Sequence, residues 1–173
     1  MAHDLTWSDK NNRRKSLKNH IHRFLLYPDF WSDTLKHIGH NLKWKKIKFA
    51  ENNFSQIPSK TGIYCFVVIP PTPNLFITRY LFYIGKASST NLKTRYKQYI
   101  NEKNGIGIGD QKPRIKIEEM LNEYYGNIYF FYSEIPIATN VLECETKLLN
   151  TFFPYVNTLI PEATISEEYR HIY

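Results

Sequence analysis

The fold is decided by the stretch from Gly62-Ile63-Tyr64 to Tyr83-Ile84-Gly85-Lys86. These residues lie in two apolar runs, IYCFVVI over 63–69 and FITRYLFYI over 76–84, and both runs are typical of β-strands. The segment between them begins with PPTPN (70–74), and because proline cannot donate to a sheet ladder, it indicates a turn or an edge insertion. The two runs therefore predict an antiparallel hairpin in which Tyr64 and Tyr83 converge on one place.

Further periodic segments surround this hairpin. We expect a third strand over 127–135, and the alternating basic and apolar run 43–49 is a candidate for a short additional strand. Helical spacing, with prolines at the first turn or just past the end of some segments, predicts helices over 14–26, 29–38, 91–101, 113–125 and 139–153.

The sequence thus predicts an α+β fold, with a small three-stranded antiparallel sheet flanked by helices. A basic, mostly helical N-terminal extension over 1–56 precedes the core domain, which we expect over 57–160. Residues 161–173 would form a C-terminal tail.

Composition narrows the class of protein. With 42% hydrophobic and 16% aromatic residues, the 173-residue chain can bury a core of its own. It has no apolar run near the roughly 18 residues of a membrane span and no signal-peptide hydrophobic region at its start, so we expect a cytoplasmic protein without a membrane partner. The two cysteines, Cys65 and Cys144, are expected to be buried free thiols, with a disulfide as the open alternative.

The net charge of +7 is placed unevenly along the chain. Residues 1–60 hold 12 Lys and Arg against five Asp and Glu, whereas residues 61–173 hold 11 of each kind. A basic stretch of this kind favours a polyanionic partner, although a solvated basic face is the plainer alternative. The residues that we expect to bind nucleic acid are Arg13, Arg14, Lys15, Lys18, Lys45 and Lys46.

The predicted helix over 139–153 carries a carboxylate on its apolar side. At about 100° per residue, Glu145 lies within about 60° of five apolar residues, and Glu143 lies about 160° away beside Lys147, as an exposed ion pair should. A carboxylate on a core-facing stripe is costly unless it is paired or bound to a metal, and a salt bridge with Arg95 stays open as the structural alternative. The five apolar residues are Val141, Leu142, Leu148, Leu149 and Phe152.

These features together resemble the GIY-YIG nuclease family over about residues 57–160. Glu145 is followed by Leu148 at +3, Pro154 at +9 and Asn157 at +12, which is similar to the motif of repair nucleases in this family. Lys86 directly follows the second tyrosine motif. Arg95 lies on the next predicted helix, and Tyr99 follows it by four residues. Compared with the family pattern, the hairpin insertion is longer and two extra residues separate Lys86 from Arg95, and both differences fall in loops.

The resemblance implies metal-dependent hydrolysis of DNA phosphodiester bonds. Glu145 would hold one Mg²⁺ or Mn²⁺ ion, and Arg95 would contact the scissile phosphate. Tyr64 would act as general base or orient the water, which requires a neighbouring cation such as Lys86 because a free phenol is a weak base near neutral pH. The further catalytic residues that the resemblance implies are Tyr83, Tyr99 and Asn157.

Other functions remain as alternatives. The second hypothesis is a nucleic-acid-binding module that keeps the fold without cleavage, and the third is a protein-interaction domain, which leaves the charge asymmetry unexplained. The glycine run GIGIG (105–109) lacks the Lys-Ser/Thr of a phosphate loop. The pairs His20/His22 and His37/His40 lack a third ligand pattern, so they indicate solvated residues or phosphate contacts more than zinc ligands.

Overall fold

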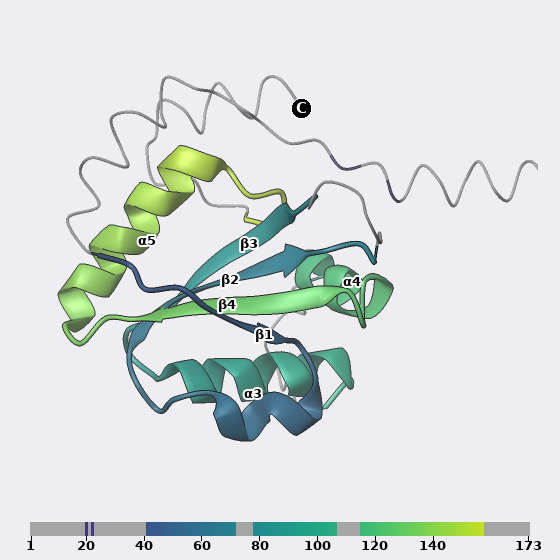
Figure 1. Cartoon of the computed structure of the whole chain (residues 1–173), viewed down its shortest axis with the longest axis horizontal. Coiled ribbons are helices and arrows are strands. Elements are labelled where there is room, and N and C mark those ends of the chain that lie inside the picture. Colours follow the sequence, from purple (N-terminus) through teal and green to yellow (C-terminus); the bar gives the residue numbers. More distant parts are fainter. Residues whose placement is uncertain (1–19, 21, 23–40, 72–77, 107–114, 158–173) are drawn as a thin grey trace, which may run out of the picture.

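A computed structural model describes residues 20, 22, 41–71, 78–106 and 115–157 of the chain. Within these residues, four strands, one 3-10 helix and three α-helices form an α+β domain (Figure 1). In chain order the elements are β1 (Lys45–Lys48), η1 (Glu51–Gln56), β2 (Gly62–Val68), β3 (Tyr80–Ala87), α3 (Leu92–Lys103), α4 (Ile115–Glu123), β4 (Ile128–Glu134) and α5 (Ala138–Phe152).

The strands form one antiparallel sheet in the order β1-β4-β2-β3, so β1 and β3 are its edges. The predicted hairpin is confirmed as β2 and β3, although β3 starts at Tyr80 and continues through Gly85 to Ala87. The predicted count of three strands is wrong, because β1 pairs with β4 as a fourth strand. Ile47 lies opposite Phe130 and packs against the core, which ties this short basic strand to the sheet.

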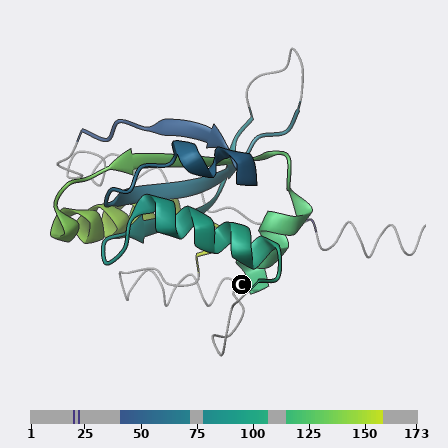
Figure 2. The ribbon, with the colours of Figure 1, turned by 90° about the horizontal axis from the view of Figure 1, so that it is seen from below.

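Helices cover both faces of the sheet. Because successive strand residues point to opposite faces, Tyr64 and Phe66 pack with α3 and α4, whereas Ile63 and Cys65 pack with α5. Figure 1 shows α3 and α5 on opposite sides of the sheet, and in Figure 2, seen from below, α3 lies in front of the strands. The α5 helix contacts β2 and β3, so it lies over the half of the sheet that carries the hairpin.

Local chemistry sets the ends of the helices that position the site. Asn91 caps α3 by accepting a hydrogen bond from the Thr94 N–H at 2.8 Å, and α5 ends where Phe153 adopts a left-handed conformation (φ 43°) before Pro154. The predicted helices over 91–101, 113–125 and 139–153 are confirmed as α3, α4 and α5. The predicted helices over 14–26 and 29–38 lie outside the described residues, apart from His20 and His22.

None of the described helices is long and apolar enough to cross a membrane.

Candidate active site around the edge strand β3

Three tyrosines of the predicted site form one cluster on the α3 face of the sheet. The hydroxyls of Tyr64 and Tyr99 are hydrogen-bonded at 2.9 Å, and their ring centroids lie 5.8 Å apart. The ring of Tyr83 lies 6.3 Å from that of Tyr64 and 6.2 Å from that of Tyr99. Tyr64 and Tyr99 are buried, whereas Tyr83 is partly exposed, so Tyr83 is the member of the cluster that solvent reaches. The predicted convergence of Tyr64 and Tyr83 is confirmed.

Close packing explains the glycine of each motif. Tyr64 lies opposite Gly85 in the register, and a Cβ at position 85 would lie 2.6 Å from the Tyr64 Cζ and hydroxyl oxygen. A Cβ at Gly62 would lie 2.2 Å from the carbonyl oxygen of Ser133 on β4. Both distances are far below van der Waals contact, so a side chain at either position would displace the strand or the tyrosine.

The Lys86–Glu145 ion pair joins β3 to α5 on the opposite face of the sheet. The Lys86 Nζ lies 2.5 Å from the Glu145 Oε2, and the two side chains are 34% and 15% exposed. Lys86 lies opposite Ile63 in the register, and Ile63 belongs to the α5 face. The expectation that Lys86 neighbours the Tyr64 hydroxyl is therefore wrong, because the alternation of strand residues sends the two side chains to different faces. Glu145 thus forms its salt bridge with Lys86 and not with Arg95, which was the structural alternative.

On α5, the buried stripe runs along Val141, Cys144 and Leu148, and Glu145 lies at its rim. The prediction that Glu145 occupies the centre of the stripe is wrong, because two of the apolar residues that defined it face solvent. Leu142 is 52% exposed and Phe152 is 38% exposed. The predicted exposed ion pair between Glu143 and Lys147 is confirmed.

The Asn157 side chain is hydrogen-bonded to the main chain of β3 at Ile84, the residue between Tyr83 and Gly85. Its Oδ1 accepts a hydrogen bond from the Ile84 N–H, its Nδ2 donates to the Ile84 carbonyl oxygen, and both distances are 2.8 Å. The neighbouring Val156 N–H donates to the Phe82 carbonyl oxygen at 2.9 Å. The chain after α5 therefore pairs with the outer edge of β3 and fixes the backbone on either side of Tyr83.

Arg95 lies on α3, one turn before Tyr99. Its guanidinium Nη1 donates to the Gln98 Oε1 at 3.1 Å, and its Nε atom is buried without a hydrogen-bond partner among the described residues. A buried guanidinium N–H without a partner is costly, and an anion such as a phosphate would satisfy it.

The predicted site residues thus form two groups that share the edge strand β3. The tyrosine cluster with α3 lies on one face, and Lys86 with Glu145 lies on the other. Lys45 and Lys46 lie on β1, the opposite edge of the sheet, and Lys45 is paired with Glu134 at 2.7 Å. The other basic residues that we expect to bind nucleic acid lie outside the described residues. These are Arg13, Arg14, Lys15 and Lys18.

The cysteines are neutral thiols within the core. Cys65 and Cys144 are both free and buried on the α5 face, which confirms the prediction of free thiols. Burial raises the pKa of Cys65 to about 12 and that of Cys144 to about 11, so neither supplies a thiolate near neutral pH.

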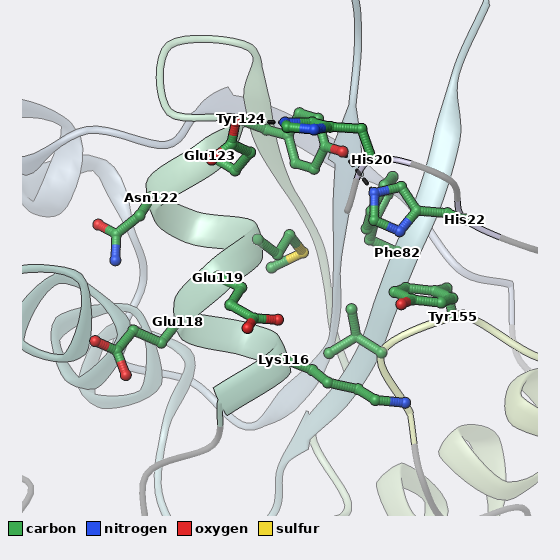
Figure 3. Close-up of a pocket in the computed structure, with 12 residues that line it drawn as sticks. His20, His22, Phe82, Lys116, Glu118, Glu119, Asn122, Glu123, Tyr124 and Tyr155 are labelled. Carbon is green, nitrogen blue, oxygen red and sulfur yellow. Dashed lines mark hydrogen bonds and ion pairs between the residues drawn. The ribbon is translucent and has the colours of Figure 1, made fainter. Parts of the chain in front are cut away.

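Sequence reasoning missed a cavity of about 830 Å³ on the α4 side of the domain (Figure 3). Its wall includes Phe82 and Tyr155, which are neighbours of the candidate site, together with His20 and His22. The interpretation of these histidines as solvated residues is wrong for His22, whose half-buried ring lies 5.1 Å from that of Phe82 and 4.6 Å from that of Tyr155. The sequence around His22 is rich in basic residues and has no local pattern that would predict its contact with two distant aromatic rings.

Among the described residues, no group of three or more His, Cys, Asp and Glu side chains is arranged to hold a metal ion. Glu145 alone is compatible with Mg²⁺, which is often bound through one or two carboxylates and keeps several waters. Its Oε2 faces Lys86, and its Oε1 makes no hydrogen bond to the described part of the chain.

No protein-family profile, curated protein or solved structure matches this chain.

Proposed function

We propose that this protein is a divalent-metal-dependent DNA endonuclease of the GIY-YIG type. The observation that carries the proposal is that strand β3 brings Tyr83 and Lys86 to one edge of the sheet, where Tyr64 and Tyr99 flank the first and Glu145 pairs with the second. Side chains that are far apart in the sequence contact each other at this edge. Tyr64 and Tyr99 are 35 positions apart, and Lys86 and Glu145 are 59 positions apart.

Each side chain has a distinct role in this proposal. Arg95 supplies guanidinium donors for the scissile phosphate, and its buried Nε is a donor that a phosphate oxygen would satisfy. Tyr83, as the partly exposed phenol, orients the attacking water. Tyr64 and Tyr99 lie behind it and hold its ring in place. Asn157 keeps the β3 backbone in register.

Glu145 would hold Mg²⁺ or Mn²⁺, and the ion when bound would stabilise negative charge on the scissile phosphate and on the leaving oxygen. Because Glu145 and the tyrosine cluster lie on opposite faces of the sheet, the proposal requires the phosphate to lie beside the edge of β3, where both groups can reach it. Lys86 would neutralise the carboxylate in the absence of the ion and remain as a second cation beside the phosphate. Its side chain is 34% exposed, so solvent reaches it.

A second candidate is a module that binds nucleic acid without cleaving it. The Lys86–Glu145 ion pair and the burial of Tyr64 favour it, because both are also what a purely structural network would contain.

Cleavage of plasmid DNA separates the two candidates. We expect the purified protein to nick or linearise supercoiled plasmid with Mg²⁺ or Mn²⁺, and chelator to stop the reaction. Glu145→Ala should lower the cleavage rate by at least about 10²-fold while DNA binding measured without metal is kept or tightened, because a negative charge near the phosphate is removed.

Glu143→Ala is the matched control on the same helix. Glu143 is in an exposed pair, worth about 0.3–0.5 kcal/mol, so this variant should cleave at the wild-type rate. Binding of plasmid without any metal-dependent cleavage would support the non-catalytic module, and equal loss of activity in both variants would remove the role of Glu145.

A further inference from the structure

His22 lies among three aromatic rings that come from different parts of the domain (Figure 3). Its ring centroid is 5.1 Å from that of Phe82 on β3, 5.8 Å from that of Tyr124 after α4, and 4.6 Å from that of Tyr155 after α5. All three contacts are edge-to-face, a geometry that is favourable between aromatic rings. The Nε2 of His22 is also hydrogen-bonded to the Tyr124 hydroxyl at 2.5 Å.

His20 makes a second contact at the end of α4. Its Nε2 lies 2.5 Å from the Glu123 Oε1, and its ring packs edge-on against Tyr124 with centroids 6.4 Å apart. The two histidines are separated by one residue, and the partners of their hydrogen bonds lie more than 100 positions further along the chain. We call the surface that they contact the histidine-docking surface; it consists of Phe82, Glu123, Tyr124 and Tyr155.

The histidine-docking surface adjoins the candidate active site. Phe82 directly precedes Tyr83 on β3, and Tyr155 lies two residues before Asn157, which holds the same strand. Phe82 belongs to the same core cluster as Tyr64 and Tyr99, so the histidines dock on the face of the tyrosine cluster.

The sequence around the histidines is rich in basic residues. Residues 10–23 contain six Lys and Arg and no Asp or Glu. Lys18 precedes His20 by two residues in the sequence, and Arg23 directly follows His22. The two docked histidines therefore belong to a strongly basic stretch of the sequence.

We propose that the histidine-docking surface is the docking site of the chain's own basic N-terminal segment, and that His22 is the anchor that positions this segment to bind DNA phosphates beside β3. The inference rests on the proposed function for the identity of the polyanion. In the opposite case, the basic residues would be held away from DNA by the three carboxylates that line the cavity beside His22. These are Glu118, Glu119 and Glu123.

The test compares His22→Ala with His22→Phe at pH 8, where histidine is neutral and neither change alters the net charge. Equilibrium DNA binding is measured without metal at several salt concentrations. We expect His22→Ala to weaken binding about 10-fold near 100 mM salt and to lower the slope of log K against log salt by about 1–2, as if one or two phosphate contacts were lost. His22→Phe keeps a ring among the three aromatic residues and should bind nearly as the wild type does.

Tyr125→Ala is the matched control, because Tyr125 is a 43% exposed aromatic residue next to Tyr124 and does not line the cavity. Docking is measured separately as the rate of tryptic cleavage after Arg23 relative to cleavage after Arg170. His22→Ala should accelerate the cleavage after Arg23 at least about threefold, and Tyr125→Ala should leave it unchanged.

An unchanged salt slope in His22→Ala, together with faster cleavage after Arg23, would overturn the positioning role. Tighter DNA binding in this variant would show that docking masks the basic segment, which also overturns it. If the wild type resists trypsin at Arg23 but binds no DNA, the proposed function fails while the docking of the segment stands. If the wild type binds DNA and His22→Ala changes neither measurement, only the present inference fails.

Discussion

Tyr64 and Gly85 show how one residue pair links the two motifs. The residues are partners in the register of β2 and β3, and the Tyr64 ring fills the space that a side chain at position 85 would need. This packing directs the Tyr64 hydroxyl to that of Tyr99, in a part of the core that excludes water. The hydrogen bond between the two phenols is therefore a buried structural contact, and its role in the proposed activity can be tested by removing one hydroxyl.

We predict that Tyr64→Phe lowers the turnover rate by up to about 10²-fold, because the lost hydrogen bond to Tyr99 loosens the cluster that holds Tyr83 in place. The ring stays in the core, so the free energy of unfolding should fall by only about 0.5–1.5 kcal/mol for the lost hydrogen bond. Single-turnover cleavage and urea denaturation measure the two effects. Wild-type turnover in this variant would leave Tyr64 with a packing role only.

His22 is expected to respond to pH. Burial, and next the charge of His20, lower the pKa of His22 from its usual value of 6.5. The docked state thus disfavours the protonated ring, so the docking free energy is fully present above pH 6.5 and is lost as the pH falls through the lowered pKa. The titratable groups that line the cavity around this ring are His20, Lys116, Glu118, Glu119, Glu123, Tyr124 and Tyr155.

An NMR titration of the histidine ring protons tests this expectation. We predict a midpoint for His22 below 6.5 in the wild type and a return toward 6.5 in Tyr124→Ala, which opens the site to water. A midpoint at or above 6.5 in the wild type would show that His22 is solvated.

The edge strand β3 depends on a side chain that replaces a neighbouring strand. Asn157 makes two hydrogen bonds to the Ile84 main chain, as a residue of an adjacent strand would. This arrangement covers part of an edge that would otherwise expose unpaired backbone groups, and it holds the segment between Tyr83 and Gly85.

Asn157→Ala should therefore lower the free energy of unfolding by about 1–3 kcal/mol and reduce cleavage more than DNA binding. Urea denaturation and metal-free binding assays measure the two quantities. Asn104→Ala is the control, since the Asn104 amide contacts the side chains of Glu51 and Lys103 at the surface, and its cost should stay within about 0.5 kcal/mol. Equal costs for the two variants would contradict a specific role for Asn157.

Over these 173 residues, the excess positive charge lies N-terminal to the motif residues. We predict that replacing Arg13, Arg14, Lys15 and Lys18 with Gln lowers the slope of log K for DNA against log salt by roughly 2–4, at about 0.9 for each lost phosphate contact. Fluorescence anisotropy at several salt concentrations measures the slope. An unchanged slope would mean that this cluster faces solvent or another protein.

Lys45→Gln with Lys46→Gln provides the comparison on the opposite edge of the sheet. Lys45 is already paired with Glu134, and Lys46 lies 5.3 Å from the centre of the Tyr129 ring. If DNA follows β3 alone, the slope should stay unchanged in this double variant. A slope lowered by about 1–2 would extend the DNA contact across the sheet to β1.

The hairpin, the three described α-helices and the strand β4 were predictable because their signals are local. Alternating apolar runs, the Asn91 cap and the stop at Pro154 act within a few residues of the elements that they define. The convergence of Tyr64 and Tyr83 followed from the hairpin alone. The same local reasoning misplaced Glu145, because a helical wheel treats Leu142 and Phe152 as core residues whatever packs against them.

Only the tertiary structure decided the contacts between distant parts of the chain. These are the pairing of β1 with β4, the choice of Lys86 as the partner of Glu145, and the docking of His22 on three aromatic rings. Each depends on which surfaces meet once loops have closed and a common core has formed, and no residue within a few positions of either partner specifies it. Hydrophobic period and capping chemistry establish the elements, whereas burial and charge pairing across the sheet establish the site.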